Sequence, residues 1–137
     1  MPDVVEAAPA SDGDLLLTPL TATLTTVDAP GRPQSTAVWY LVADGQLVAS
    51  TTSDRQKYKN LVGKPNCSLL IIGPENPYRT LEIRAEVALT PDRDKATVRK
   101  LAQAYGVDES MLVNEHEERF TLSLHARRIV ANPAPQG

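Results

Sequence analysis

The chain has 137 residues, of which 42% are hydrophobic and 23% charged, a length and composition that suit one globular domain with a single core. Its formal net charge of −3 argues against a protein whose main partner is nucleic acid or an anionic membrane surface. Because the sequence has no apolar run of about 18 residues and no signal-peptide pattern, we expect a cytoplasmic protein.

Both ends of the chain are rich in proline and small or polar residues. We expect residues 1–19 to be a short, loosely ordered segment, residues 20–132 the folded domain and residues 133–137 a flexible tail. Residues 20–27 are rich in threonine, residues 28–31 read Asp-Ala-Pro-Gly, and residues 34–42 alternate in polarity. This pattern predicts a hairpin whose second strand runs on to Val42.

A third strand, a helix and a fourth strand are predicted next. Asp44-Gly45 is a two-residue turn signal that leads into a strand over residues 46–51. A short helix is predicted over residues 55–62, ended by the Gly-Lys-Pro that follows. Residues 66–72 form an apolar run that indicates a buried strand. It contains Cys67, the only cysteine, which we expect to be a small buried residue and not a reactive thiol.

Clean alternation marks the second half of the chain. Residues 78–90 alternate between apolar and charged side chains, which predicts a long strand with one solvated face. Thr90 and Pro91 fit an N-cap and the first position of a helix that ends before Gly106. The apolar face of that helix consists of Val98, Leu101, Ala102 and Tyr105.

A closing strand begins at Phe120, and its alternation changes phase after Ala126, which suggests a β-bulge. With it, the chain has about six mostly antiparallel strands and two or three peripheral helices, without a βαβ rhythm. The predicted fold is mainly β within the α+β class, a small β-barrel.

Hydroxyl and cationic side chains gather where the third strand gives way to the first predicted helix. Residues 50–52 read Ser-Thr-Thr, and Arg55 and Lys57 follow at the start of the helix. Unsatisfied N–H groups at a helix N-terminus carry partial positive charge, so this group suits a phosphate. In the alternative interpretation, Ser53 or Asp54 only caps the helix and the cations form a solvated face.

No set of side chains indicates a catalytic group or a metal site. Neither His116 nor His125 has a cysteine, an aspartate or a second histidine at metal-ligand spacing, and no Ser-His-Asp or Cys-His set is visible. We therefore assign no catalytic residue and no metal. The segment over residues 107–118 matches no motif; it either shapes a substrate pocket or only connects two elements.

Seven short motifs occur in order between residues 20 and 130. They are Thr-Leu-Thr-Thr at 23–26, Gly-Arg-Pro-Gln at 31–34, Val-Trp-Tyr at 38–40, Ser-Thr-Thr at 50–52, Lys-Tyr-Lys-Asn-Leu at 57–61, Lys-Pro-Asn at 64–66 and Tyr-Arg-Thr-Leu-Glu-Ile-Arg at 78–84. In their order and spacing they resemble the pyridoxamine 5'-phosphate oxidase-like split β-barrel superfamily. Within it, the match is closest to the actinobacterial branch of flavin and deazaflavin oxidoreductases that uses coenzyme F420.

This resemblance implies a split β-barrel that forms a homodimer with cofactor sites at the interface. The implied cofactor is F420, with FMN as the alternative. Its phosphate and chain would contact Ser50, Thr51, Thr52, Arg55 and Lys57. Its ring would lie over the second strand, along the backbone of Gln34, Ser35, Thr36 and Ala37. Asn60 would hold the helix or the phosphate, and the partner subunit would contribute Tyr78 and Arg79. Compared with the family, the region before the barrel is short, with only residues 12–17 available for the usual leading helix.

Four functions remain open at this stage. The first is an F420-dependent oxidoreductase that transfers hydride to a small organic acceptor; further cations such as Lys59 and Lys64 favour the glutamate tail of F420. The second is an FMN-dependent enzyme of the same fold, and the third is a non-catalytic carrier of F420 or another small ligand. A nucleic-acid-binding barrel is disfavoured by the negative net charge and by an aromatic content of only 4%.

Overall fold

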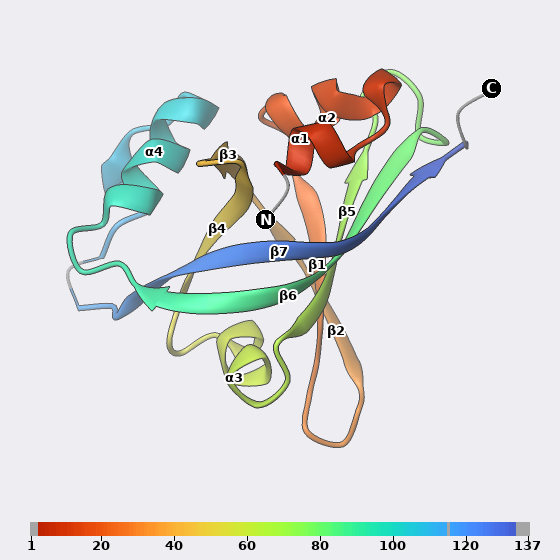
Figure 1. Ribbon diagram of the computed structural model, residues 1–137. Helices are drawn as coiled ribbons and strands as arrows, with labels where there is room; N and C mark the ends of the chain where they lie inside the picture. Colours follow the sequence, from red (N-terminus) through yellow and green to blue (C-terminus); the bar gives the residue numbers. More distant parts are fainter. Residues whose placement is uncertain (1–2, 115, 134–137) are drawn as a thin grey trace.

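Seven antiparallel strands form one sheet in the order β2-β1-β5-β6-β7-β4-β3 (Figure 1). The structure is a computed structural model that describes residues 3–114 and 116–133. Its strands are β1 Ala22–Val27, β2 Pro33–Val38, β3 Leu41–Ala43, β4 Gln46–Thr52, β5 Asn66–Ile72, β6 Thr80–Pro91 and β7 Arg119–Asn132. Its helical segments are α1 Val4–Ala7, η1 Ala10–Asp12, α2 Gly13–Leu17, α3 Gln56–Gly63, α4 Ala96–Tyr105 and η2 Glu109–Met111.

The sheet closes on itself because its two edge strands are consecutive in the chain. Only Trp39 and Tyr40 separate β2 from β3, so the two edges must lie close together at that point. The result is the split β-barrel expected from the family resemblance. None of the helices in the described part of the chain is both long and apolar enough to cross a membrane.

The prediction of a single strand over residues 34–42 was wrong, because the structure has two strands there, β2 and β3. β2 ends at Val38, and Leu41–Ala43 pairs with β4 instead of continuing along β1. The backbone of Tyr40 leaves the sheet because the Tyr105 hydroxyl takes the place of a strand partner: it accepts from the Tyr40 N–H at 3.0 Å and lies 2.9 Å from the Tyr40 carbonyl. The buried Tyr40 hydroxyl donates to the carbonyl of Leu15 at 2.7 Å. These bonds fix the turn between the two edges of the barrel.

Strands β5, β6 and β7 form the centre of the sheet and supply much of the core. The predicted alternation of β6 is confirmed, since Leu81 and Ile83 are fully buried. The predicted bulge in β7 is also confirmed: Arg84 pairs with Arg128 and Ala85 with Ala126, which leaves Arg127 as the extra residue. Cys67 is buried on β5, and burial raises the pKa of its thiol to about 12, as expected for an inert side chain.

Helix α4 begins at Ala96, five residues later than predicted. Thr90 and Pro91 do not cap it, because β6 continues through them and Pro91 pairs with Phe120. The carboxylate of buried Asp92 instead accepts from the N–H groups of Thr97 and Val98, at 3.4 Å each. The helix ends at Gly106, whose φ of 68° is left-handed, as the sequence indicates.

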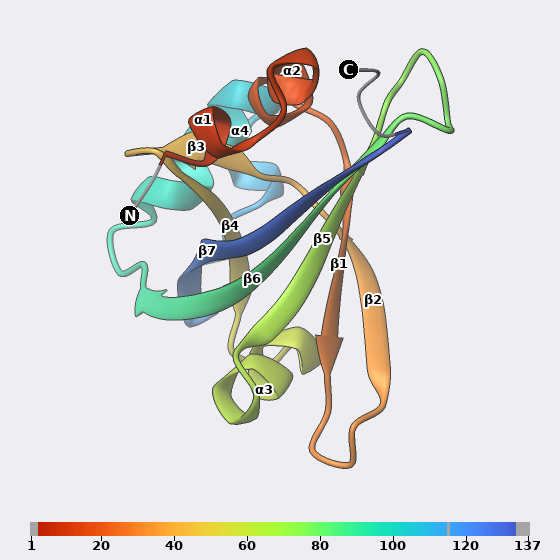
Figure 2. The same ribbon diagram turned by 45° about the vertical axis from the view of Figure 1, so that its right-hand side comes forward.

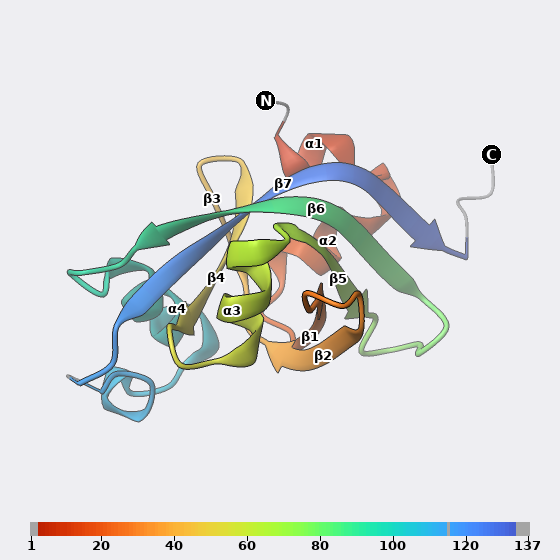
Figure 3. The ribbon, with the colours of Figure 1, turned by 90° about the horizontal axis from the view of Figure 1, so that it is seen from below.

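The N-terminal segment differs from the loose segment that was expected. Residues 3–17 form α1, η1 and α2, which lie over one end of the barrel (Figure 2). Val4, Leu15 and Leu16 are buried in the core, and their burial orders the segment. Residues 1–2 and most of the predicted tail, residues 134–137, lie outside the described residues. Helix α3 lies at the other end of the barrel (Figure 3).

Candidate functional site

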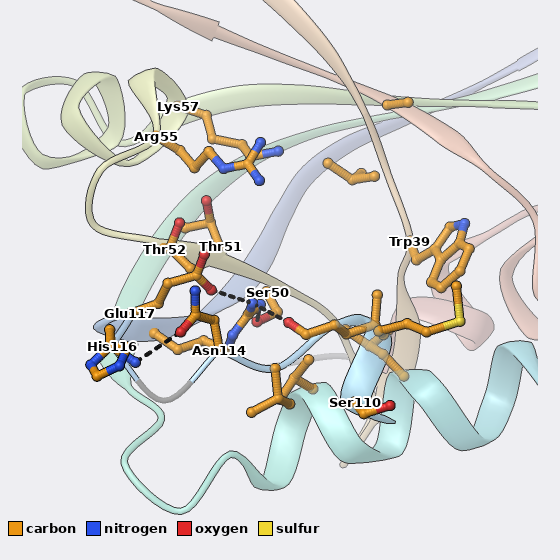
Figure 4. A pocket seen from close by; sticks show the side chains of 18 of the residues that line it. Trp39, Ser50, Thr51, Thr52, Arg55, Lys57, Ser110, Asn114, His116 and Glu117 are labelled. Atoms are coloured by element: carbon orange, nitrogen blue, oxygen red, sulfur yellow. Dashed lines mark hydrogen bonds and ion pairs between the residues drawn. The ribbon is translucent and has the colours of Figure 1, made fainter. Parts of the chain in front are cut away.

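A pocket of about 810 Å³ lies between β4, the end of β2, the start of α3 and helix α4 (Figure 4). Its lining includes residues 37–39 and 50–52, Arg55 and Lys57. It is completed by α4 and by the segment that runs from Ser110 toward β7. This volume is within the range of about 300 to 1,000 Å³ that is usual for small-molecule sites.

The three hydroxyls that line the pocket from β4 differ in what they can still bind. Ser50 Oγ accepts from the guanidinium of Arg119 at 3.0 Å, so its own hydrogen is available for a ligand. Thr52 donates to Asp54 at 2.5 Å and is already engaged. Thr51 is only 3% exposed, and its Oγ1 has no hydrogen-bond partner in the described part of the chain. A buried hydroxyl without a partner is costly, and this one belongs to a residue that lines the pocket.

Arg55 and Lys57 place two positive charges beside these hydroxyls, and Figure 4 shows their side chains on the same side of the pocket. Among the described residues, neither forms an ion pair with a carboxylate. Lys57 Nζ donates to Thr36 Oγ1 at 3.2 Å. Burial, and then the charge of Arg55, lower the pKa of Lys57, because both disfavour the charged amine. An anion here would favour the charged amine and so offset both effects.

Neither Ser53 nor Asp54 caps helix α3, which the alternative interpretation of this segment expected. Arg55 occupies the N-cap of α3 and makes no side-chain cap, and Asp54 accepts from Thr52 instead. The first N–H groups of α3 therefore have no side-chain acceptor at the N-cap. Among the described residues, the start of α3 has no side-chain cap, Arg55 and Lys57 form no ion pair, and the Thr51 hydroxyl has no partner. Together these observations favour an anion-binding interpretation over a solvated face.

The sequence could not place residues 107–118; of these, residues 110–114, 116 and 117 line the pocket. Arg119 holds it there: its guanidinium donates to the carbonyl of Leu112 at 2.6 Å and to Glu117 at 3.3 Å, as well as to Ser50. Arg119 was not predicted as a site residue, because its role depends on the pairing of β7 with β4. That pairing places Arg119 opposite Thr52. Asp108 and Asn114, whose side chains accept from the N–H groups of Ser110 and His116, are local signals of turns there.

Four predicted contact residues on β2 and α3 lie beside the pocket without lining it. Asn60 is buried and donates to Thr26 Oγ1 at 3.0 Å, so it fastens α3 to β1. Gln34 lies next to this pair, since its Oε1 is 3.5 Å from both groups. Ser35 shares a 2.8 Å hydrogen bond with Thr25, and Thr36 accepts from Lys57. Of the four predicted β2 residues, Ala37 alone lines the pocket.

Tyr78 and Arg79 lie far from this pocket within the same chain. They belong to the loop between β5 and β6, beside α2, whereas α3 lies at the opposite end of the barrel (Figures 1 and 2). Tyr78 is 79% exposed. Arg79 forms ion pairs with Asp12, Asp14 and Glu75 at 3.2, 2.6 and 2.8 Å, so its charge is already compensated. Their contribution to the pocket of a partner subunit stays a prediction.

The two histidines are in different surroundings. His116 is exposed and lines the pocket. His125 lies on β7, and its Nδ1 is buried without a partner among the described residues. No group of three His, Cys, Asp or Glu side chains that could hold a metal ion occurs in residues 3–114 and 116–133.

Comparisons with known proteins agree with this fold. A family model described as pyridoxamine 5'-phosphate oxidase matches residues 13–131. A solved F420 reductase is 30% identical, with a TM-score of 0.80 and coverage of 90% of this chain and 98% of its own. The conserved hypothetical protein Rv2991 from Mycobacterium tuberculosis is 22% identical, with a TM-score of 0.76 and coverage of 95% and 90%.

The haem storage protein HutZ from Vibrio cholerae is 16% identical, with a TM-score of 0.73 and coverage of 96% of both chains. At their low identities, Rv2991 and HutZ show a shared fold only. The search of curated proteins found no match.

Proposed function

Since this chain belongs to the pyridoxamine 5'-phosphate oxidase family, we propose that it is an oxidoreductase that binds coenzyme F420 in the pocket between β4, α3 and α4 and transfers hydride to a small organic acceptor. The choice of F420 over other coenzymes is supported by the 30% identity with an F420 reductase over 90% of the chain. The exposed cations Lys59 and Lys64, outside the pocket, are available for the glutamate tail of F420.

The observation that carries the proposal is a pair of cations, Arg55 and Lys57, beside the Thr51 hydroxyl. Among the described residues, neither cation forms an ion pair with a carboxylate, and the hydroxyl has no hydrogen-bond partner. These groups fit a phosphate: two positive charges offer charge-assisted hydrogen bonds, and Ser50 and Thr51 each have a hydroxyl hydrogen to donate. The ring would lie along β2, where Ala37 lines the pocket and the backbone of residues 34–36 continues the strand.

The coenzyme supplies the redox chemistry when bound: a hydride, which is two electrons and one proton, passes from its reduced form to the acceptor, and a second proton comes from solvent. The chain's own residues bind and orient. Arg55 and Lys57 hold the anionic end, Ser50 is held in place by Arg119, and α4 with the segment after it covers the pocket. No side chain is assigned a proton-transfer role.

We propose further that the active form is a homodimer, in which the β5–β6 loop of the partner subunit completes the site. Tyr78 suits this role because it is 79% exposed in its own chain. Arg79 is already bound to three carboxylates, so it would act by fixing the loop that carries Tyr78.

A parallel titration of the purified protein with F420, FMN and haem tests the proposal. We expect micromolar or tighter binding of F420, weaker binding of FMN, and oxidation of reduced F420 when an acceptor is added. Tighter binding of FMN would assign the protein to the flavin branch. F420 binding without turnover across a broad acceptor panel would indicate a carrier, and binding of haem alone would reject the proposal.

A further inference from the structure

A second pocket, of about 390 Å³, lies between the β3–β4 hairpin and helix α4. The strand register shows which face of the sheet it occupies. Leu47 and Leu124 pair within the core, so the next pair, Val48 and Ser123, points to the opposite face, and both of these residues line the second pocket. Helix α4 lies beside β4 (Figure 1). The volume is at the lower end of the range for small-molecule sites, which suits a ligand much smaller than a coenzyme.

Helix α4 separates the second pocket from the coenzyme pocket. Thr97 and Lys100 line the second pocket, whereas Val98 and Leu101 line the first. Among the described residues, the two pockets have no lining residue in common. None of the contacts proposed for the coenzyme therefore accounts for the second pocket.

The second pocket has a negative charge on one side and a positive charge on the other. Asp44 belongs to the turn between β3 and β4, and Lys100 belongs to α4; both are exposed. Within the described part of the chain, neither forms an ion pair, so the two charges do not neutralise each other directly. A ligand that lies between them has a partner for a positive group at one end and for a negative group at the other.

The position of Asp44 is fixed by its turn. Asp44 and Gly45 have φ values of 51° and 78°, and positive values at both central residues are typical of the tight two-residue turns of β-hairpins. The N–H of Val4 donates to the carbonyl of Gly45 at 2.8 Å, which fastens the turn to α1. The carboxylate is therefore carried by a rigid element and not by a loose loop.

Uncharged polar groups and an apolar surface complete the second pocket. The Thr97 hydroxyl shares a 2.7 Å hydrogen bond with Thr121 Oγ1, which leaves it capacity for another partner. Ser123 adds a second hydroxyl, and the amide of Gln46 can both donate and accept. Val48, which is only 8% exposed, gives the pocket an apolar floor. The lining suits a small molecule that is polar at its ends and has a short apolar part.

We propose that the second pocket binds a small zwitterionic amino acid, with its carboxylate at Lys100 and its ammonium group at Asp44. A ligand with a single charge is attracted by one of these side chains and repelled by the other, whereas a zwitterion is attracted by both. This inference goes beyond the proposed function, because it uses none of the coenzyme contacts and holds whichever coenzyme the first pocket binds.

An NMR titration of the ¹⁵N-labelled protein without coenzyme tests the site. The probes are L-alanine, propionate, which lacks the ammonium group, and L-alaninamide, which lacks the carboxylate. The titration is done at about pH 6.5, below the pKa of roughly 8 of an α-amino group. We expect saturable amide shifts for L-alanine, confined to residues 43–48, 97–100 and the neighbourhood of Ser123. Propionate and L-alaninamide should each bind about fivefold more weakly, the upper end of the effect of an exposed charge pair.

Two variants assign each charge to its partner. In Asp44→Asn, L-alanine and propionate should bind equally, because the ammonium group has lost its partner; asparagine keeps the turn, since it tolerates a positive φ. In Lys100→Met, L-alanine and L-alaninamide should bind equally, because the carboxylate has lost its partner. Arg93→Met is the matched control, because Arg93 is an exposed cation just before α4 that does not line the second pocket. It should leave all three affinities unchanged. The amide spectrum of each variant also shows whether it is folded.

Three results would overturn the inference. They are the absence of saturable shifts with L-alanine, equal affinity of the wild-type protein for the three probes, and shifts centred on residues 50–57 in place of the second pocket. Equal weakening of L-alanine binding by Lys100→Met and Arg93→Met would also overturn it, because the effect would then come from net charge. Since no coenzyme is present, none of these results depends on whether the protein binds F420.

Discussion

Replacing Lys57 with methionine should show separately how its charge affects the stability of the ligand-free protein and how it affects coenzyme binding. Lys57 Nζ donates to Thr36 Oγ1 and forms no ion pair with a described residue, so the change removes no ion pair of the protein itself. Burial and the charge of Arg55 lower the pKa of Lys57, which means that the ligand-free protein disfavours its charge. We therefore expect Lys57→Met to leave the free energy of unfolding of the ligand-free protein unchanged or slightly higher.

Coenzyme binding should respond in the opposite direction. A charge-assisted hydrogen bond to a phosphate contributes about 1.5 to 3 kcal/mol, so its loss should weaken F420 binding about 10- to 150-fold. Isothermal titration calorimetry at low and moderate salt measures this, and the difference should shrink as salt rises. Lys100→Met is the matched control, because Lys100 is exposed on α4 and does not line the coenzyme pocket. Equal weakening by both variants, or none by Lys57→Met, would refute the reasoning.

Three further predictions follow from individual contacts. Thr51→Val removes a buried hydroxyl that has no partner among the described residues, so it should raise the free energy of unfolding by about 1 kcal/mol in a denaturant titration. It should still weaken F420 binding. A loss of stability would show that the hydroxyl has a partner. Tyr105→Phe leaves the Tyr40 N–H without its acceptor, so it should lower the free energy of unfolding by about 1 to 3 kcal/mol and shift the fluorescence of Trp39. An unchanged free energy of unfolding would show that Tyr105 does not have this structural role. Arg79→Leu breaks three ion pairs and should destabilise the protein by roughly 2 kcal/mol at pH 7. Arg79 lowers the pKa of Asp14 below its usual 3.8, so this contribution is present above that pH and is lost as pH falls through the folded-state value. The difference in stability between the wild-type and Arg79→Leu proteins should therefore shrink as the pH falls below 3.8, and a constant difference would contradict the ion-pair account.

Most of the sheet could be predicted because its residues follow local rules. The strand over residues 66–72 was located from its apolar run and the flanking turn residues, and the phase change after Ala126 located the bulge in β7. The hydroxyls and cations of residues 50–57 were predicted together for the same reason, because a strand end and a helix start are local events. Six of the predicted contact residues line the pocket, and five of them come from this one segment.

What the sequence could not show depends on contacts between distant segments. The break between β2 and β3 requires the Tyr105 hydroxyl, which bonds to Tyr40 from 65 residues further along the chain. The start of α4 was misplaced because β7 keeps Pro91 in the sheet, and the pairing of β7 with β4 also gives Arg119 its role. The N-terminal segment looked loose in composition, yet Val4, Leu15 and Leu16 are buried in the core at the barrel end.

A crystal structure of the protein with F420 bound tests the central claim most directly. The account predicts that the coenzyme phosphate lies within hydrogen-bond distance of Lys57 Nζ, the guanidinium of Arg55 and the Thr51 hydroxyl, with the ring along β2 near Ala37. A phosphate bound elsewhere, with Arg55 and Lys57 still facing solvent, would contradict it.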